Sequence, residues 1–387
     1  MTPCPEGWRE KVDPDIAALV TCDPWPEGGQ QSCAEDEAHF PGGPGCERIG
    51  PPCPDGEWPA EIPADARVLY VRAGEPEGGD GTRERPFGWI SEAVADASDG
   101  DVIALSKGLF DEEVRIDRAV TLLGACVLET RIAPSETGAQ PAALTLRAAT
   151  VVRNLQVGGA GPGIDALETN GTAELDSVLV REATKVGVNV GSRATIDAME
   201  LAIRETASGL IEPRLEAGVG LDASGGAQVR LERAAIERSI RRGVRARDEG
   251  TALAAAGLVV ADTQYGWGVA ALGGAQVTLR RTVVEVERGQ VIGVGVEDQG
   301  TALMAENLVL SGDGLSASGG ARVTLDRSEV AGCEAVGVWA LGEGTVLTAA
   351  DLVISDTLPQ ESDGTFGVGL SVTAAALVTL ERAVLER

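Results

Sequence analysis

The chain of 387 residues contains only one histidine, His39, and only three lysines, Lys11, Lys107 and Lys185. A lone histidine argues against a Ser-His-Asp triad and against a zinc site built from several histidines. Aromatic residues make up 3% of the chain, and no apolar run reaches the roughly 20 residues that cross a membrane as a helix. The formal net charge of −28 leaves no basic footprint for nucleic acid or for an anionic membrane surface. We therefore expect an acidic protein with a thin aliphatic core, which binds no nucleic acid and has no membrane span.

Cysteine is unevenly distributed along the chain. Five of the seven cysteines lie in the first 53 residues: Cys4, Cys22, Cys33, Cys46 and Cys53. This segment is rich in Pro and Gly and has no hydrophobic periodicity, so disulfides are the expected source of its stability. Zinc is the alternative, but the spacing lacks a Cys-x-x-Cys pair. Because five is odd, we expect one of these cysteines to pair with Cys126, and Cys333 to remain a buried thiol. Disulfides predict an extracellular or cell-surface location, although the first residues lack the basic and hydrophobic regions of an export signal.

The most regular feature of the sequence is a repeat between Gly218 and Thr348. Glycine followed by an apolar residue recurs about every 21 to 25 residues, at Gly218, Gly243, Gly268, Gly293, Gly314 and Gly337. A fixed period in this range predicts a solenoid. The runs between the glycines alternate with period two, as in Ala275–Leu279, which indicates β-strands. Leucine-rich repeats have a similar period, but their asparagine position is missing here.

The repeats also alternate in pairs. A Gly-Gly-Ala form at Gly225, Gly274 and Gly319 alternates with a Gly-Thr form at Gly250, Gly300 and Gly344. An alternation of large and small side chains between stacked coils is one explanation.

The segment before the repeats has a recognisable order of elements. Val68–Val71 reads as a strand, a loop containing Gly-Asp-Gly-Thr and Pro-Phe follows, and Ile90–Ala97 has a helical apolar face. Gly-Asp-Val-Ile, Lys-Gly-Leu-Phe and Val-Thr-Leu-Leu-Gly-Ala come next, ending at Cys126. This order resembles the N-terminal cap and first coil of the right-handed parallel β-helix proteins of the pectin lyase-like superfamily.

The resemblance implies an all-β fold. We expect a right-handed parallel β-helix of about a dozen coils over residues 67–387, with a short N-terminal capping helix, preceded by a Cys-rich irregular segment, residues 1–66. Trp8, Trp25 and Trp58 are expected to anchor that segment on the end of the solenoid. Two long intervals predict loops that protrude from the coils, near Ser208–Glu216 and Leu358–Thr365.

The superfamily also suggests which catalytic residues to look for. Polygalacturonases carry paired aspartates, Gly-His-Gly and Arg-x-Lys, and none of these is present here. Pectate lyases bind Ca²⁺ through carboxylates on adjacent coils and use an arginine base. We therefore assign no catalytic residue and no metal ligand, and keep Ca²⁺ as the one candidate cofactor.

Aligning the coils at their glycines brings charged residues together on one outward face. The alignment places Asp222 beside Arg247, about 5 Å away, with Arg245 next to them. Glu297 and Trp339 fall on the same face. These five residues are our candidate ligand-binding site, suited to an anionic sugar. A surface ion pair between neighbouring coils is the alternative interpretation.

The sequence therefore favours a non-catalytic extracellular or cell-surface protein: a structural rod, an adhesin or a carbohydrate-binding protein, with a carbohydrate or another cell-surface protein as partner. The first alternative is a polysaccharide lyase or hydrolase that acts on an acidic polysaccharide. The second is a filament subunit that associates with itself through its rod ends, because Ala376–Arg387 still reads as a coil without a polar cap.

Overall fold

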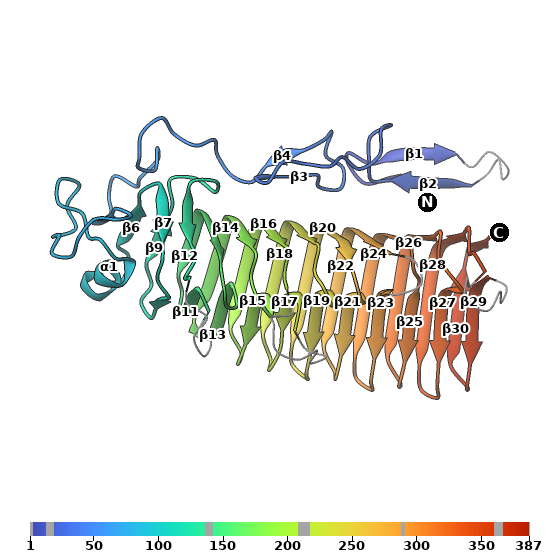
Figure 1. Cartoon of the computed structure of the whole chain (residues 1–387). Helices are drawn as coiled ribbons and strands as arrows, with labels where there is room; N and C mark the ends of the chain where they lie inside the picture. The colour runs from blue at the N-terminus through green and yellow to red at the C-terminus, as the bar shows by residue number, and fades with distance from the viewer. Residues whose placement is uncertain are drawn as a thin grey trace.

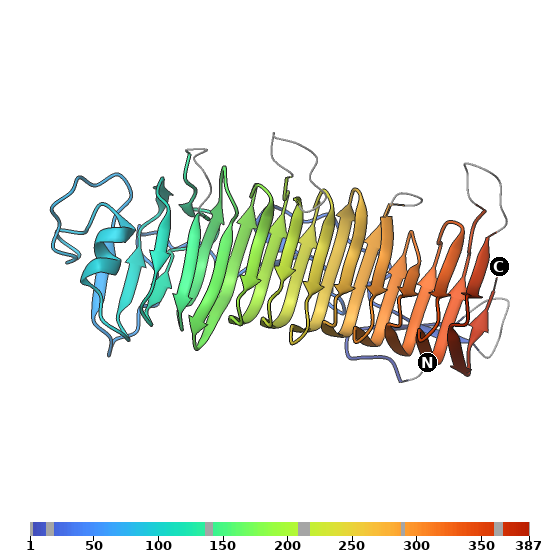
Figure 2. The same ribbon diagram turned by 90° about the horizontal axis from the view of Figure 1, so that it is seen from below.

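The chain forms a long parallel β-solenoid with a separate segment lying along its side (Figures 1 and 2). A computed structural model describes residues 3–12, 19–135, 142–207, 217–287, 291–359 and 367–386. The solenoid has about ten turns, somewhat fewer than the dozen expected, and one short helix. The predicted loops at 208–216 and 358–365 lie largely outside the described residues. No described helix has the length and apolar character needed to cross a membrane.

Two sheets run the length of the solenoid, and from β11 to β30 consecutive strands of the chain belong to them alternately, so that each of these turns adds one strand to each sheet. We call them the bent sheet and the short-strand sheet. The bent sheet is built mainly of long strands: β12 (Val151–Gly158), β14 (Thr172–Arg181), β16 (Thr195–Arg204), β18 (Gln228–Glu237), β20 (Ala252–Thr263), β22 (Gln276–Val286), β24 (Ala302–Ser311), β26 (Arg322–Ala331) and β28 (Val346–Ser355). The short-strand sheet contains β8 (Val114–Ile116), β11 (Leu144–Ala148), β13 (Ile164–Asn170), β15 (Val186–Gly191), β17 (Val219–Ala223), β19 (Arg242–Arg247), β21 (Gly266–Leu272), β23 (Val291–Glu297), β25 (Leu315–Ser318), β27 (Val336–Leu341) and β29 (Val368–Thr373).

The N-terminal turns confirm the expected order of elements. They comprise β5 (Val68–Val71), α1 (Ile90–Asp96), β6 (Val102–Leu105), β7 (Gly108–Phe110), β9 (Thr121–Leu123) and β10 (Thr130–Ile132). The last described turn contains β30 (Leu377–Glu381) and β31 (Val384–Leu385).

Each long strand turns a corner at a single residue. This residue is left-handed in every rung, with φ between 46° and 69°: Asn154, Ser177, Glu200, Arg233, Gly257, Arg281, Asn307, Arg327 and Asp351. One left-handed residue redirects the strand without breaking its pairing to the next rung. It divides the bent sheet into a first limb, before the corner, and a second limb, after it, so the solenoid has three faces.

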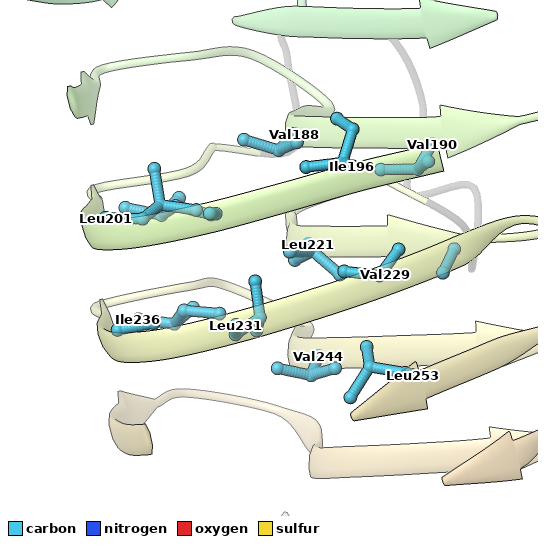
Figure 3. Close-up of a cluster of buried hydrophobic side chains, with 14 of the residues drawn as sticks. Val188, Val190, Ile196, Leu201, Leu221, Val229, Leu231, Ile236, Val244 and Leu253 are labelled. Atoms are coloured by element: carbon cyan, nitrogen blue, oxygen red, sulfur yellow. The ribbon is translucent and has the colours of Figure 1, made fainter. Parts of the chain in front are cut away.

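The core is a stack of aliphatic side chains from all three faces, and Figure 3 shows part of it around Val188, Leu221 and Val244. A column of glycines makes room for it where the short strands begin. A Cβ on Gly243 would lie 2.2 Å from Val260 Cγ1, and one on Gly220 would lie 2.4 Å from Ile236 Cγ2. The glycines are therefore required by packing.

The position of these glycines corrects our alignment of the coils. Val219 pairs with Arg242 and Leu221 pairs with Val244, so Gly220, and not Gly218, belongs to the glycine column. The sequence Gly-Val-Gly-Leu offers two glycines, and we aligned the first. The register of β17 was therefore wrong by two residues.

Hydrogen bonds between turns follow the two-coil alternation. Gly226 N donates to Thr251 Oγ1 at 3.0 Å, and Gly225 N donates to Asp248 Oδ2 at 3.0 Å. The same bonds recur two turns later, from Gly274 N to Thr301 and from Gly273 N to Asp298. A Gly-Gly turn thus exposes backbone donors that the side chains of the following Gly-Thr turn accept.

We expect Thr251→Val to destabilise the protein by about 1–2 kcal/mol, because it leaves the Gly226 N–H without its acceptor. The free energy of unfolding in urea measures this. Thr324→Val, at an exposed strand position, is the matched control and should change it by less than about 0.5 kcal/mol. Equal effects of the two substitutions would contradict the role of the hydroxyl.

Residues 3–12 and 19–66 form an extended strap along the rod, containing β1 (Arg9–Val12), β2 (Val20–Asp23), β3 (Glu37–Ala38) and β4 (Glu47–Arg48) (Figure 1). Its disulfides confirm the cysteine prediction: Cys4–Cys22 and Cys33–Cys46 lie within the strap, and Cys53–Cys126 joins it to the rod. Cys333 is buried and takes no part in a disulfide.

The path of the strap corrects our expectation for the tryptophans. Trp58 does lie near the N-terminal end, beside Tyr70, but Trp25 packs against Val259 and Val283 on the side of the rod. Further towards the N-terminal end, Phe40 and Ile49 belong to a second apolar cluster. It is completed by outward residues of the rod, namely Val127, Leu179, Ala202 and Ala235.

One buried arginine fastens the middle of the strap. Arg204, only 4% exposed, donates from Nη1 to the carbonyls of Ala34 and Glu35 at 3.0 and 2.7 Å. Its Nη2 donates to the carbonyl of Glu37 at 2.5 Å, and its Nε donates to Glu237 Oε2 at 2.7 Å. The guanidinium therefore joins the strap and the rod at one point.

Candidate functional site

The outer face of the short-strand sheet carries a continuous column of side chains that are neighbours from rung to rung. From β13 to β29 the column reads Asp165, Asn189, Asp222, Arg245, Ala270, Gly295, Ser316, Trp339 and Ser371. Polar and charged residues occupy its first four positions, and small residues follow up to Trp339. Adjacent positions are roughly 4.8 Å apart.

Asp222 and Arg245 form a buried ion pair at the centre of the polar part. Arg245 Nε and Nη2 donate to the two carboxylate oxygens at 2.8 and 2.6 Å. The residues are only 2% and 4% exposed, so this pair is not the surface ion pair we had as the alternative. Arg245, and not Arg247, is the direct partner of Asp222, whose carboxylate lies 3.5 Å from Arg247 Nη2. The corrected register of β17 explains why Arg245, and not Arg247, lies opposite Asp222.

Two further arginines lie near the ends of β19: Arg247 beside this pair, and Arg241 just before the strand begins. Arg241 and Arg247 are half-buried, and the Nε atom of each is buried without a hydrogen-bond partner in the part of the chain that the structure describes. Arg247 reaches Asp222 only through its terminal nitrogen. In an acidic chain, the basic residues along β19 form a local positive patch, and the guanidinium of Arg247 is suited to a carboxylate or sulfate.

Trp267 extends this patch, and the sequence analysis did not select it. The Arg242 guanidinium lies 5.5 Å from the centre of the Trp267 ring. A Cβ on Gly295 would lie 3.0 Å from two atoms of that ring, so the ring lies directly over the glycine. The glycine thus allows the indole to lie against the sheet. The sequence signal was the run of small residues beside this position, Ala270 and Gly295.

Glu297 and Trp339 lie on the predicted face but apart from the arginines. Leu272 separates Glu297 from Arg247 in the neighbouring column, and three rungs separate Trp339 from Arg245. Burial raises the pKa of Glu297, with Asp298 adding to the shift and Arg242 opposing it. Trp339 is 42% exposed and lines a pocket of about 180 Å³ together with Ile292, Asp313, Ser316, Glu334 and Val336.

Asp165 is the other residue that we did not select. It occupies the first position of the column, with Asn189 between it and Asp222. Burial raises the pKa of Asp165, and a hydrogen bond from Asn189 opposes the shift. A carboxyl group with a raised pKa can donate a proton, while Asp222 is ion-paired with Arg245 two rungs away. The signal was present in our alignment, where Asp165 and Asn189 already shared a column.

Within the described ranges, no group of acidic side chains on this face converges like a metal site. Among the described residues, the group of potential metal ligands within 4.8 Å of one another is Cys53, Cys126 and Glu129, and its two cysteines form a disulfide. A role for Ca²⁺ remains a prediction. His39 lies in the strap, where its Nδ1 accepts from Gln31 N at 2.9 Å and its ring packs against Trp25.

Comparison with known proteins identifies the fold through structure alone. No protein-family model matches the chain, and no curated protein sequence matches it. A GH136 lacto-N-biosidase from Eubacterium ramulus superposes with a TM-score of 0.53 at 10% identity, over 81% of this chain and 68% of that one. The catalytic domain of a GH87 α-1,3-glucanase, solved with tetrasaccharides, gives 0.50 at 10% identity, over 86% and 71%. An alginate lyase from a Paenibacillus species gives 0.46 at 16% identity, over 81% and 99%.

The first two likenesses, with two continuous parallel sheets and an N-terminal capping helix, agree with the fold that the resemblance implied. The chain has a parallel β-helix fold.

Proposed function

We propose that this protein is an exported glycoside hydrolase, which binds an acidic polysaccharide on the outer face of the short-strand sheet and cleaves it there. The observation that carries the proposal is the column Asp165–Asn189–Asp222–Arg245, flanked by Arg241, Arg247 and Trp267. Two solved proteins with a similar fold are named as enzymes that act on glycans, which supports the enzymatic alternative over the non-catalytic function that the sequence favoured. The three disulfides support export.

The residues suggest distinct roles. Arg247 binds the carboxylate of a uronic acid, and Trp267 contacts the apolar side of a sugar ring. Asp165 acts as the general acid and protonates the leaving glycosidic oxygen, while a water molecule attacks the anomeric carbon and loses a proton to the solvent. Because burial raises the pKa of Asp165, this carboxyl group keeps its proton to higher pH than an exposed aspartic acid does. Activity should therefore fall as the pH rises through the raised pKa of Asp165.

Non-catalytic binding of the same polysaccharide is the second candidate function. It is favoured by the Asp222 carboxylate, which is buried and held by two bonds from Arg245. A carboxylate engaged in this way is a poor base for activating water, so the face would hold a sugar without a complete pair of catalytic carboxyl groups.

Incubation with uronate-containing polysaccharides and with neutral glucans tests the proposal. We expect new reducing ends from the uronate polymers only, and a loss of about 100-fold or more in rate for Asp165→Asn, with binding retained. Glu168→Gln, an exposed carboxylate on the same strand, is the matched control and should keep full activity. Binding without products would favour the second candidate. Unsaturated products that depend on Ca²⁺ would instead identify a lyase.

The arginines have their own test. Arg247→Gln should weaken binding of a uronate oligosaccharide by about tenfold, the effect of one charge-assisted hydrogen bond, as measured by calorimetry. Arg230→Gln is the control, because Arg230 lies on the bent sheet, and this variant should bind the oligosaccharide with unchanged affinity. An unchanged affinity for Arg247→Gln would place the sugar elsewhere.

A further inference from the structure

The strap is held to the rod in two different ways along its length. We call residues 33–49 its proximal section, and residues 3–12 with 19–25 its distal section. Arginines of the rod fasten the proximal section: Arg204 binds three carbonyls, and Arg233 donates to Glu47 at 2.8 Å and lies over the Phe40 ring. In the distal section, the ion pair of Arg9 is with Asp23 of the same section. Beneath Trp25 and Thr21 of the distal section, the rod presents the carboxylates of Glu285 and Glu329. In the described part of the chain, rod arginines lie only next to its first residues, where Arg280, Arg281 and Arg327 line a pocket with Pro3–Glu6.

Glu329 is the first of these carboxylates. It stands in an outward column of the second limb that is otherwise mostly apolar: Leu179, Ala202, Ala235, Val259, Val283, Val309, Glu329 and Val353. The strap covers this column, and Thr21 donates a side-chain hydrogen bond to Glu329. Lys11, Asp23 and Asp356 are the charged groups that act on it. A charged residue in an apolar, covered column weakens docking when it is ionised.

Glu285, on β22, is the second of these carboxylates. It lies in the outward column next to the one that contains Val283. The Trp25 indole donates a hydrogen bond to its side chain, and Trp25 itself packs on Val259 and Val283. Asp262 is the charged group that acts on Glu285, and a neighbouring pocket of about 660 Å³ adds the carboxylates of Glu287 and Asp356. Ionised Glu285 therefore sits among other negative charges directly beneath the strap.

We propose that the distal section is a pH-dependent latch, which docks on the rod when Glu285 and Glu329 are protonated and lifts away when both are ionised. The proximal section stays attached through Arg204, Arg233 and the Cys53–Cys126 disulfide. Lifting uncovers the apolar strip of Val259, Val283 and Val309 on the side of the rod.

The direction of the pH dependence follows from burial. Burial raises the pKa of Glu329, with Asp23 and Asp356 adding to the shift and Lys11 and Thr21 opposing it. Burial likewise raises the pKa of Glu285, with Trp25 opposing the shift and Asp262 adding to it. Docking that raises a carboxyl pKa is most favourable below the pKa of the free group. It weakens as the pH rises through the raised value. The latch therefore closes in acid and opens towards neutral and alkaline pH.

Hydrogen exchange followed by mass spectrometry tests the latch in the intact protein. Between mildly acidic and mildly alkaline pH, the protection of the distal section should fall by about tenfold or more relative to that of the proximal section. The proximal section serves as the internal reference, because it reports the intrinsic effect of pH on exchange. Binding of a dye specific for exposed apolar surface should rise over the same interval.

The double variant Glu285→Gln with Glu329→Gln keeps the shape of both side chains and an acceptor for Trp25, but cannot ionise. Its distal section should stay protected at both pH values. Glu174→Gln, exposed on β14 and away from the strap, is the control and should behave as the native protein does. If the double variant does not fold, Glu329→Gln alone is judged by the same criterion. Equal protection of the native strap at both pH values, or a pH dependence that persists in the glutamine variant, would overturn the latch.

Discussion

Arg204→Met should destabilise the protein by about 3–5 kcal/mol and detach the middle of the strap. The substitution keeps the aliphatic stem of the side chain but removes the N–H groups that donate to Glu237 and to three strap carbonyls. The site is buried, since Arg204 is only 4% exposed. Removing only the arginine leaves the Glu237 carboxylate and the three carbonyls buried, with neither water nor a donor. The lost hydrogen bonds therefore destabilise the folded state by the full desolvation penalty of these groups. A lower urea midpoint, together with faster proteolysis between Cys33 and Cys46, measures both effects.

Arg230→Met is the matched control for this prediction. Arg230 also pairs with a carboxylate, Asp197, at 3.3 Å, but its side chain is 72% exposed. Exposed pairs contribute about 0–1 kcal/mol, so this variant should unfold close to the native midpoint. If both arginine variants had the same small effect, the apolar contacts of Phe40 and Ile49 would be sufficient to hold the strap.

Replacing Cys53 and Cys126 by alanine should lower the free energy of unfolding by about 4 kcal/mol, the largest effect we expect of any disulfide here. The bond closes a sequence separation of 73 residues and is the covalent joint between strap and rod. Without it, the unfolded chain gains the freedom of a long open loop. Calorimetric or urea unfolding under non-reducing conditions provides the measurement.

The Cys33–Cys46 pair offers the comparison, because it closes a separation of only 13 residues. Its replacement by alanine should destabilise the protein by roughly 1.5 kcal/mol less, if loop entropy in the unfolded chain governs both bonds. A larger effect of the short loop would mean that native packing of the strap around Cys33–Cys46 dominates over loop length.

The fold could be predicted from the sequence because its signals are local and repeated. Glycine spacing, period-two strands and an odd number of N-terminal cysteines led to the solenoid and to the pairing of Cys126. The register of β17 could not be predicted in the same way. Gly218 and Gly220 satisfy the same local pattern, and only the contact of Gly220 with Ile236, across the core, distinguishes them.

The candidate site was predicted less completely for the same reason. Asp222, Arg245 and Arg247 are brought together, but the choice of partner depended on the register. Trp267 was missed because its position depends on Gly295, which lies in the next turn of the same sheet. The side-on path of the strap had a readable signal: the second limbs carry consecutive apolar residues, as in Leu258–Val260, which indicates that their outer face is covered.

The strap has a consequence for the order in which the protein matures. Rungs of a solenoid bind their sequence neighbours and can add one after another as the chain is synthesised. The contacts of Arg204 with Glu37 and of Arg233 with Glu47 instead span 167 and 186 residues. Likewise, Trp25 cannot pack until Val283 has been synthesised. The strap is therefore synthesised before the rod but docks only after the rungs that it covers have formed. Until then, the growing rod carries an uncovered apolar strip, so docking of the strap is the step that completes the burial of its apolar surface.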